Sequence, residues 1–174
     1  MRKSALLVAA MLTLPAAVAL AQPAVPRNVL SIQPLNAVFS VFSGEYERAA
    51  GKSASWGIGG NYWGAGDSND DVDYTSAEFK LRYYPNGVAL EGFSFGGAVG
   101  FASVTGRNSS GGNESVGGPS IGVLLEYQWL MGVKKNFTVA LGAGAKALNI
   151  SKGDIQQSVT AKYPTLRISV GLAF

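Results

Sequence analysis

The sequence predicts an all-β protein, an eight-stranded antiparallel up-and-down barrel, and three observations carry this prediction. Apolar residues alternate with small or polar ones in segment after segment, a period typical of strands with two different faces. The segments are about 9–11 residues long, the length of a tilted strand that crosses a bilayer. Glycine is frequent, with 23 residues of 174, and no helical periodicity follows the amino-terminal segment.

The amino terminus predicts a secretory signal peptide over residues 1–21. Arg2 and Lys3 precede the apolar run Ala5–Leu14, and Ala19-Leu20-Ala21 supplies the small-x-small pattern before the expected cleavage. The alternative is a retained membrane anchor, but the apolar run is short for a bilayer span and Pro15 interrupts it. Residues 22–174 are then expected to form one exported barrel domain.

Histidine and cysteine are both absent from the chain. Their absence excludes disulfides, Ser-His catalysis and His-ligated metals, so we expect no enzyme, no cofactor and no metal site. The carboxylate pair Glu45 and Glu47 is the enzymatic alternative that remains. Without Arg2 and Lys3 the 14 basic residues fall to 12, against 11 acidic ones, and this balance gives no reason to expect nucleic-acid binding.

The alternation defines candidate strands joined by connections of two kinds. Seven strands follow from the pattern: Ala37–Arg48, Ser55–Gly64, Tyr74–Tyr84, Phe93–Val104, Pro119–Leu130, Phe137–Leu148 and Tyr163–Phe174. Tight connections alternate with longer polar ones: Ala49–Ala54, Pro85–Gly92 and Met131–Asn136 are tight, and Ala65–Asp73, Thr105–Gly118 and Asn149–Lys162 are long. Transmembrane barrels separate short turns and long loops in this way, one kind at each end.

An eighth strand is needed before Ala37 if the chain begins and ends on the side of the short turns. Val29–Gln33 can supply this strand, with a turn at Pro34-Leu35-Asn36. Eight is also the even number expected of such barrels. The alternative is a single long, bent strand from Val29 to Arg48.

Aromatic residues gather at the strand ends beside the short turns. They are Tyr46, Trp56, Tyr83, Phe93, Tyr127, Trp129, Phe137 and Phe174. Such rings favour the headgroup zone of a membrane, whereas around a water-soluble barrel they would form an exposed apolar belt. The pattern therefore predicts a transmembrane barrel. A soluble, lipocalin-like carrier is the alternative and would need a partner to cover this belt.

The signal peptide, eight short strands, polar loops and terminal aromatic together resemble the small eight-stranded bacterial outer-membrane barrels, such as the OmpX proteins and the OmpA membrane domain. The segments Gly44-Glu45-Tyr46-Glu47-Arg48 and Arg82-Tyr83-Tyr84-Pro85 are similar to a group of these barrels without an assigned function. The resemblance implies a bacterial outer-membrane location, contact with outer-membrane lipid and lipopolysaccharide, and insertion by the barrel-assembly machinery; we expect a monomer. It implies an assembly signal on the last strand: Leu166, Ile168, Val170, Leu172 and Phe174.

The face opposite the apolar one carries four acids and four bases. They are Glu45, Glu47, Glu78, Lys80, Arg82, Glu126, Lys146 and Arg167. The interior of an eight-stranded barrel is just wide enough for side chains, and an unpaired buried charge costs several kcal/mol. We therefore expect a salt-bridge network that plugs the lumen, and a structural or surface-interaction role.

The alternative is a narrow channel, or a binder of small lipophilic ligands in the lumen. It rests on two strands with small inward residues: Ser94, Gly96, Ala98, Gly100 and Ala102, and Thr138, Ala140, Gly142 and Gly144. Such residues more often make room for bulky neighbours or let strands bend.

The first long loop imitates a Ca²⁺-binding loop, with Asp67-x-Asn69-x-Asp71-x-Asp73 followed by Glu78. Val72 stands where that loop needs glycine, and Glu78 is better explained as a lumen residue. A solvated acidic loop is the favoured interpretation, with a divalent site as the alternative.

Overall fold

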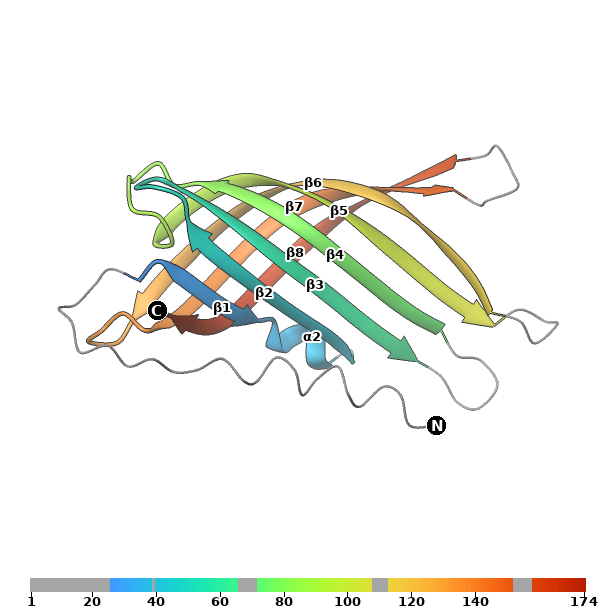
Figure 1. Cartoon of the computed structure of the whole chain (residues 1–174), viewed down its shortest axis with the longest axis horizontal. Helices are drawn as coiled ribbons and strands as arrows, with labels where there is room; N and C mark the ends of the chain where they lie inside the picture. Colours follow the sequence, from blue (N-terminus) through green and yellow to red (C-terminus); the bar gives the residue numbers. More distant parts are fainter. Residues whose placement is uncertain (1–25, 39, 66–71, 108–112, 152–157) are drawn as a thin grey trace.

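The computed structural model describes residues 26–38, 40–65, 72–107, 113–151 and 158–174, and its strands form one closed antiparallel barrel (Figure 1). The elements are β1 (Asn28–Ile32), α2 (Pro34–Val38), β2 (Val41–Ala49), β3 (Ala54–Ala65), β4 (Val72–Tyr83), β5 (Gly92–Arg107), β6 (Asn113–Met131), β7 (Phe137–Ser151) and β8 (Ser158–Ala173). Each strand pairs with the next, and β8 pairs with β1 to close the barrel. The predicted eight-stranded up-and-down fold is confirmed.

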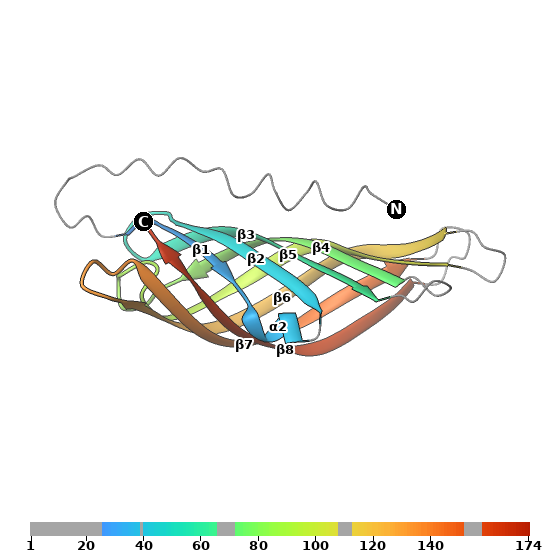
Figure 2. The same cartoon turned by 90° about the horizontal axis from the view of Figure 1, so that it is seen from below.

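The two ends of the barrel differ. The carboxyl terminus lies at the end that also holds the β2–β3, β4–β5 and β6–β7 connections, which we call the turn end (Figures 1 and 2). The opposite end, where β3 ends and β4 begins, we call the loop end. The predicted signal peptide and residues 66–71 of the first predicted loop lie outside the described residues. In the part of the chain that the structure describes, no helix has the length and apolar run needed to cross a bilayer.

The first strand confirms the sequence prediction, and the second corrects it. β1 is a separate strand, so the alternative of one bent strand from Val29 to Arg48 is wrong. β2 begins at Val41 rather than at Ala37, because Ala37 belongs to the short helix α2. Pro34 suits the first position of a helix, since its ring presets φ and a first-turn N–H has no partner to lose. The helix ends where the Ser40 N–H donates to the Ala37 carbonyl and Ser40 adopts a φ of 59°.

The strands also run further toward the loop end than predicted. β5 continues to Arg107 and β6 begins at Asn113, so most of the predicted loop Thr105–Gly118 is strand. β7 and β8 shorten the predicted loop Asn149–Lys162 in the same way. Polar cross-strand contacts hold these extensions, as where the hydroxyls of Ser103 and Ser115 lie 2.8 Å apart. The alternation of apolar and polar residues stops where the apolar outer surface of the barrel ends. Backbone pairing between strands continues beyond that point.

A small apolar cluster closes the turn end of the lumen. It consists of Val29, Tyr84, Ala89, Leu90 and Ala173. The β4–β5 connection supplies three of its members, and it is tied to the β2–β3 connection because the Tyr84 N–H donates to the Ser53 carbonyl at 2.7 Å. Leu90 has no exposed surface and a φ of 70°, a left-handed conformation that costs a leucine about 1–2 kcal/mol. Surrounding contacts must hold such a residue in place.

Candidate functional site: the charged lumen

All eight charged residues expected in the lumen point into the barrel, from five strands. Glu45 and Glu47 lie on β2, Glu78, Lys80 and Arg82 on β4, Glu126 on β6, Lys146 on β7 and Arg167 on β8. Their neighbours in each strand point outward, as the alternating burial shows. The structure brings the eight into one connected set of ion pairs.

Glu45 lies at the centre of this set and accepts from three cations. Its carboxylate lies 2.5 Å from Lys80 Nζ, 2.6 Å from Arg82 Nη2 and 3.0 Å from Arg167 Nη1. Charge-assisted bonds of this length are about twice as strong as neutral ones. Glu45 therefore links β2 to β4 and β8 across the lumen.

Arg82 is fully buried and contacts the carboxylates of Glu47 and Glu126 as well as that of Glu45. Its Nη1 lies 3.3 Å from Glu47 Oε1, and its Nε lies 3.5 Å from Glu126 Oε1. Neither of these two nitrogens forms a hydrogen bond of good geometry, so their contacts are ion pairs only. Glu126 also lies 3.2 Å from Arg167 Nη1, which joins β6 to the same set.

Glu47 is held by two neutral donors as well as by Arg82. The Ser55 hydroxyl donates to Glu47 Oε1, and the Tyr84 hydroxyl donates to the same oxygen at 2.8 Å. Burial, together with the Glu47 carboxylate, raises the pKa of Tyr84 well above its usual value of 10.0. Tyr84 therefore links the charged set to the apolar cluster at the turn end.

Toward the loop end the set continues through Glu78. The Lys146 ammonium donates to Glu78 Oε1, and Lys80 Nζ lies 3.6 Å from Glu78 Oε2. Thus β4 is connected to β7 as well as to β2. The chain of contacts runs from Lys146 at one extreme to Tyr84 at the other.

Small residues flank the charged ones on neighbouring strands. Glu45 pairs with Gly59, Glu78 pairs with Gly100, and Arg167 pairs with Gly142. A Cβ built on Gly100 would lie 2.3 Å from the Ala77 carbonyl oxygen and 2.9 Å from Glu78 Cγ. The bare inward faces of β5 and β7 thus provide space for charged side chains and for close approach of strands.

A cavity of about 180 Å³ remains in the lumen beside the charged set. Its walls include Lys80, Lys146, Arg167, Glu78 and Glu126, together with Gln33, which lies between β1 and α2, and Asn36 of α2. Two buried atoms at its walls, Arg167 Nε and Glu126 Oε1, have no hydrogen-bond partner among the described residues.

The described residues contain no cluster of three or more side chains suited to hold a metal ion. Asp73 of the imitated calcium loop lies on β4 and accepts from the Tyr62 hydroxyl at 3.1 Å. Glu78 pairs with Lys146 in the lumen. Asp67, Asn69 and Asp71 lie outside the described residues.

Sequence reasoning missed three neutral members of the site. Ser55 and Tyr84 bind Glu47, and Ser31 accepts from Arg167 Nη2 at 3.4 Å. The inward parity of Ser31 and Ser55 within their strands was the available signal. Tyr84 carried the same signal, because it follows Glu78, Lys80 and Arg82 at the same parity within the predicted strand Tyr74–Tyr84.

Comparison with known proteins yields little beyond the fold. No protein-family model matches the chain, and no curated protein sequence matches it. Among solved structures, the amino-terminal β-barrel domain of Pseudomonas aeruginosa OprF is similar, with a TM-score of 0.49 and 15% sequence identity over 86% of this chain and 98% of that one. The fold is a closed, eight-stranded, antiparallel up-and-down barrel. Its closed, all-antiparallel topology confirms the resemblance stated from the sequence.

Proposed function

We propose that this protein is an integral protein of the bacterial outer membrane, with a structural or surface-interaction role and a lumen closed by ion pairs. The observation that carries the proposal is the inversion of its surfaces. Charged side chains fill the interior, whereas large apolar side chains cover the outer wall. A soluble monomer rarely exposes a contiguous apolar patch of more than a few hundred Å².

The outer wall is apolar on every strand. More than 40% of the residue is exposed for Ile32, Phe42, Ile58, Leu81, Val99, Phe101, Ile121, Val123, Leu125, Leu141, Leu166, Leu172 and Phe174. In water these surfaces would drive aggregation, whereas in a bilayer they meet hydrocarbon. This inversion favours a transmembrane barrel over a lipocalin-like carrier.

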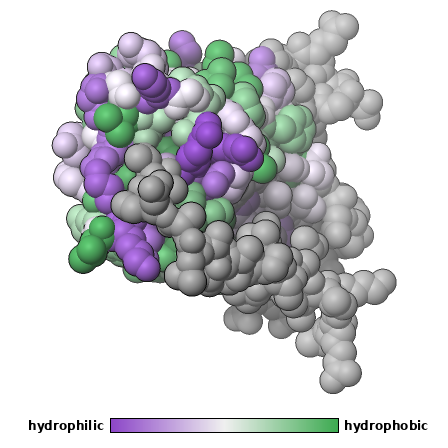
Figure 3. Space-filling model, turned by 60° about the vertical axis from the view of Figure 1, so that its left-hand side comes forward, coloured by the Kyte–Doolittle hydropathy of each residue, from purple (hydrophilic) through white to green (hydrophobic). Residues whose placement is uncertain are grey.

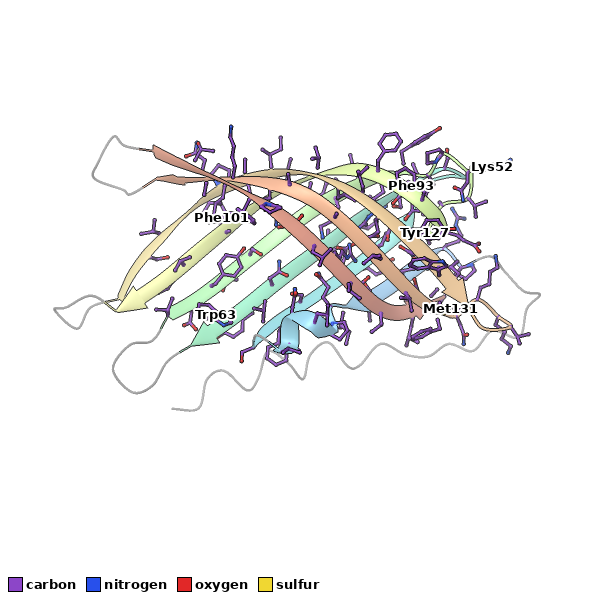
Figure 4. All side chains as sticks on the ribbon, turned by 180° about the vertical axis from the view of Figure 1, so that it is seen from behind. Lys52, Trp63, Phe93, Phe101, Tyr127 and Met131 are labelled. Carbon is purple, nitrogen blue, oxygen red and sulfur yellow. The ribbon has the colours of Figure 1, made fainter. Side chains whose placement is uncertain are left out.

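Aromatic rings support the same placement at the turn end. Phe93 and Tyr127 lie toward this end with Lys52, while Phe101 and Trp63 lie nearer the loop end (Figure 4). Tyr127 packs on Trp129 with ring centroids 4.6 Å apart, and Tyr46 meets Trp56 edge-on at 5.8 Å. Hydrophilic residues gather on the end face itself, with hydrophobic residues beside them (Figure 3). Outer-membrane barrels have their short turns on the periplasmic side, so we assign the turn end to that side.

The contacts inside the barrel support a closed lumen. The ion pairs of Glu45 and Arg82 span it, and the apolar cluster of Tyr84 and Leu90 lies at the turn end. A charged set in which acids and bases pair needs no ligand or ion to compensate it. We therefore assign no catalytic role to Glu45 and Glu47.

Fractionation tests the membrane location. The protein, expressed with its own amino terminus, should remain in the outer-membrane pellet after washes with alkaline carbonate and urea, and should need detergent for release. Recovery in the soluble periplasm without detergent would contradict the proposal.

Planar lipid-bilayer recording tests the closed lumen. The purified protein should give no reproducible single-channel steps under conditions in which a general porin does. Steps of constant size would favour the alternative of a narrow channel.

A further inference from the structure

Charge is distributed unevenly between the two ends of the barrel. Of the 14 basic residues, two lie in the predicted signal peptide and four in the lumen, and of the 11 acidic residues four lie in the lumen. The turn end holds one acidic side chain, Glu91, and five basic ones: Arg27, Arg48, Lys52, Lys134 and Lys135. The other three bases and six acids fall, by sequence, in or beside the β3–β4, β5–β6 and β7–β8 connections. The turn end is therefore the positive end of the molecule.

The bases of the turn end have few acidic partners, whereas the four bases of the lumen are matched by four acids. Lys135 pairs with Glu91, with 2.6 Å between Nζ and Oε2. Among the described residues, Arg27, Arg48 and Lys52 are exposed and form no ion pair. An anion from outside the chain can therefore approach these three bases without displacing an acidic side chain of the protein.

These three bases lie together on one side of the turn end. Arg48 on β2 pairs with Trp56 on β3. Arg27 immediately precedes β1, and the Ala49 N–H donates to its carbonyl at 2.9 Å, so it lies beside the end of β2. Lys52 lies in the β2–β3 connection, at the turn end of the barrel (Figure 4). We call Arg27, Arg48 and Lys52 the basic rim.

Two members of the basic rim share a hollow in the end face. Arg27 and Lys52 both line this hollow, which has a volume of about 400 Å³. Its other lining residues are apolar residues and glycines, and none of them is acidic. A concave surface that holds charges of one sign concentrates ions of the opposite sign. The hollow therefore favours an anionic group.

The basic rim also borders the apolar outer wall. On this wall Leu30, Tyr46 and Ile58 are paired across β1, β2 and β3, and the next outward row toward the turn end contains Arg48 and Trp56. Tyr46 meets Trp56 edge-on with ring centroids 5.8 Å apart, which joins the two rows. A long basic side chain at the border of hydrocarbon places its stem along the wall and its charge among the head groups. The partner that fits has an anion attached to hydrocarbon chains, as a phospholipid does and a soluble polymer does not.

We propose that the basic rim binds the head group of an anionic glycerophospholipid, whose acyl chains lie along the outer wall of β1–β3. The guanidinium of Arg48 binds phosphate oxygens, since its planar donors match their geometry. Lys52 and Arg27 favour a head group with a net negative charge, because they would repel the cation of a zwitterionic lipid. The proposal rests on the membrane location proposed above and adds a lipid class and a place on the barrel.

Quenching of tryptophan fluorescence by brominated lipids tests the site, because Trp56 lies beside Arg48. The chain has three tryptophans, so Trp63→Phe with Trp129→Phe leaves Trp56 as the sole reporter. The protein is placed in phosphatidylcholine vesicles with a minor share of phosphatidylglycerol, and either lipid carries bromine on its acyl chain close to the head group. Near an anionic surface one base contributes about a fivefold preference. We expect phosphatidylglycerol to be enriched at Trp56 at least about fivefold, and about 1 M salt to reduce this enrichment.

Variants separate the basic rim from the rest of the turn end. Arg48→Gln in the Trp56 reporter should lower the enrichment about fivefold. Lys134→Gln, the matched control, removes the same charge from the β6–β7 connection, four strands away around the barrel, and should keep the enrichment. In vesicles of phosphatidylcholine alone, Arg48 has no anionic lipid to bind. There Arg48→Gln should unfold at the same urea concentration as the wild type, which shows that its fold is intact.

Three outcomes would overturn the inference. They are equal quenching of Trp56 by the two brominated lipids, equal loss of enrichment in Arg48→Gln and Lys134→Gln, and displacement of phosphatidylglycerol by free glycerol phosphate, which would indicate a soluble anion. Displacement by isolated cell-wall peptidoglycan would assign the basic rim to that polymer instead. Failure of the membrane proposal gives a different result, in which neither brominated lipid quenches Trp56 at all.

Discussion

At the scale of the residue, the interior depends most on Arg82, whose side chain has no exposed surface and meets Glu45, Glu47 and Glu126. Replacing a buried ion pair by apolar groups can be neutral, but removing a single partner leaves charges uncompensated. Three carboxylates would lose their common cation here. The stability that the lumen charges give the barrel therefore depends on how they pair rather than on how many there are.

We predict that Arg82→Met lowers the free energy of unfolding by about 3–5 kcal/mol, because it leaves buried carboxylates unpaired. Urea unfolding in lipid vesicles measures the change. The control is Arg48→Met, which removes an exposed arginine of β2 and should change the free energy by about 0.5 kcal/mol or less. If both variants lost the same free energy of unfolding, the ion pairs of the lumen would stabilise the barrel no more than an exposed arginine does.

Tyr84 gives a prediction about alkaline pH. Because burial and Glu47 raise its pKa in the folded state, the unfolded state loses the phenol proton first, near pH 10.0. Its contribution to stability is thus complete below that pH and is lost as the pH rises above it. The wild type should lose stability more steeply than Tyr84→Phe between about pH 9 and pH 11, as measured by urea unfolding. Tyr83→Phe, on the outer wall, should keep the wild-type dependence of stability on pH. If Tyr84→Phe also keeps this dependence, Tyr84 does not make the buried contact with Glu47.

At the scale of the element, hydrophobic alternation predicted the strands well because one face of each forms the apolar outer wall and the other lines the lumen. Strand ends beyond the apolar band, such as Thr105–Arg107 on β5, carry no such signal, and only backbone pairing defines them. The helix α2 was missed because it is a single turn whose apolar residues do not alternate. The inward direction of all eight charged residues followed from strand parity. Which acid meets which base did not, since that depends on the stagger between strands.

Two adjacent glycines on β5 test the packing of strands. A Cβ on Gly96 would lie 2.0 Å from the Leu81 carbonyl oxygen, whereas the nearest atom to a Cβ on the outward-facing Gly97 is 3.7 Å away. Gly96→Ala should therefore lower the free energy of unfolding by about 1–3 kcal/mol. Gly97→Ala should leave it unchanged or raise it slightly. The reverse order in vesicle unfolding experiments would contradict the close approach of β4 and β5.

At the scale of the whole molecule, the barrel closes where β8 and Phe174 meet β1. The Phe174 N–H donates to the Asn28 carbonyl, and the Phe174 carbonyl accepts from Arg27 and Asn28, so the last residue completes the seal between β8 and β1. These bonds use only the backbone. The exposed ring is therefore free to act as the assembly signal that the resemblance implies.

We predict that Phe174→Ala slows insertion into outer-membrane vesicles that contain the assembly machinery, while the folded variant keeps the wild-type stability. Insertion is followed over time by the appearance of the folded protein, which migrates compactly in unheated SDS gels. Phe137→Ala removes an outward ring from β7 and should insert at the wild-type rate. Equal rates for both variants would leave the terminal ring without a role in assembly.

The most direct test of the central claim, a membrane wall around a closed and charged interior, is spin labelling of adjacent residues on β6. The chain has no cysteine, so Val123→Cys and Leu124→Cys each carry one label. Val123 is 66% exposed on the outer wall, and its label should collide with oxygen dissolved in the bilayer but not with a polar nickel reagent. The label at Leu124, on the inward face, should be protected from both. Access of the nickel reagent at Val123 would contradict the membrane wall, and access at Leu124 would contradict the closed lumen.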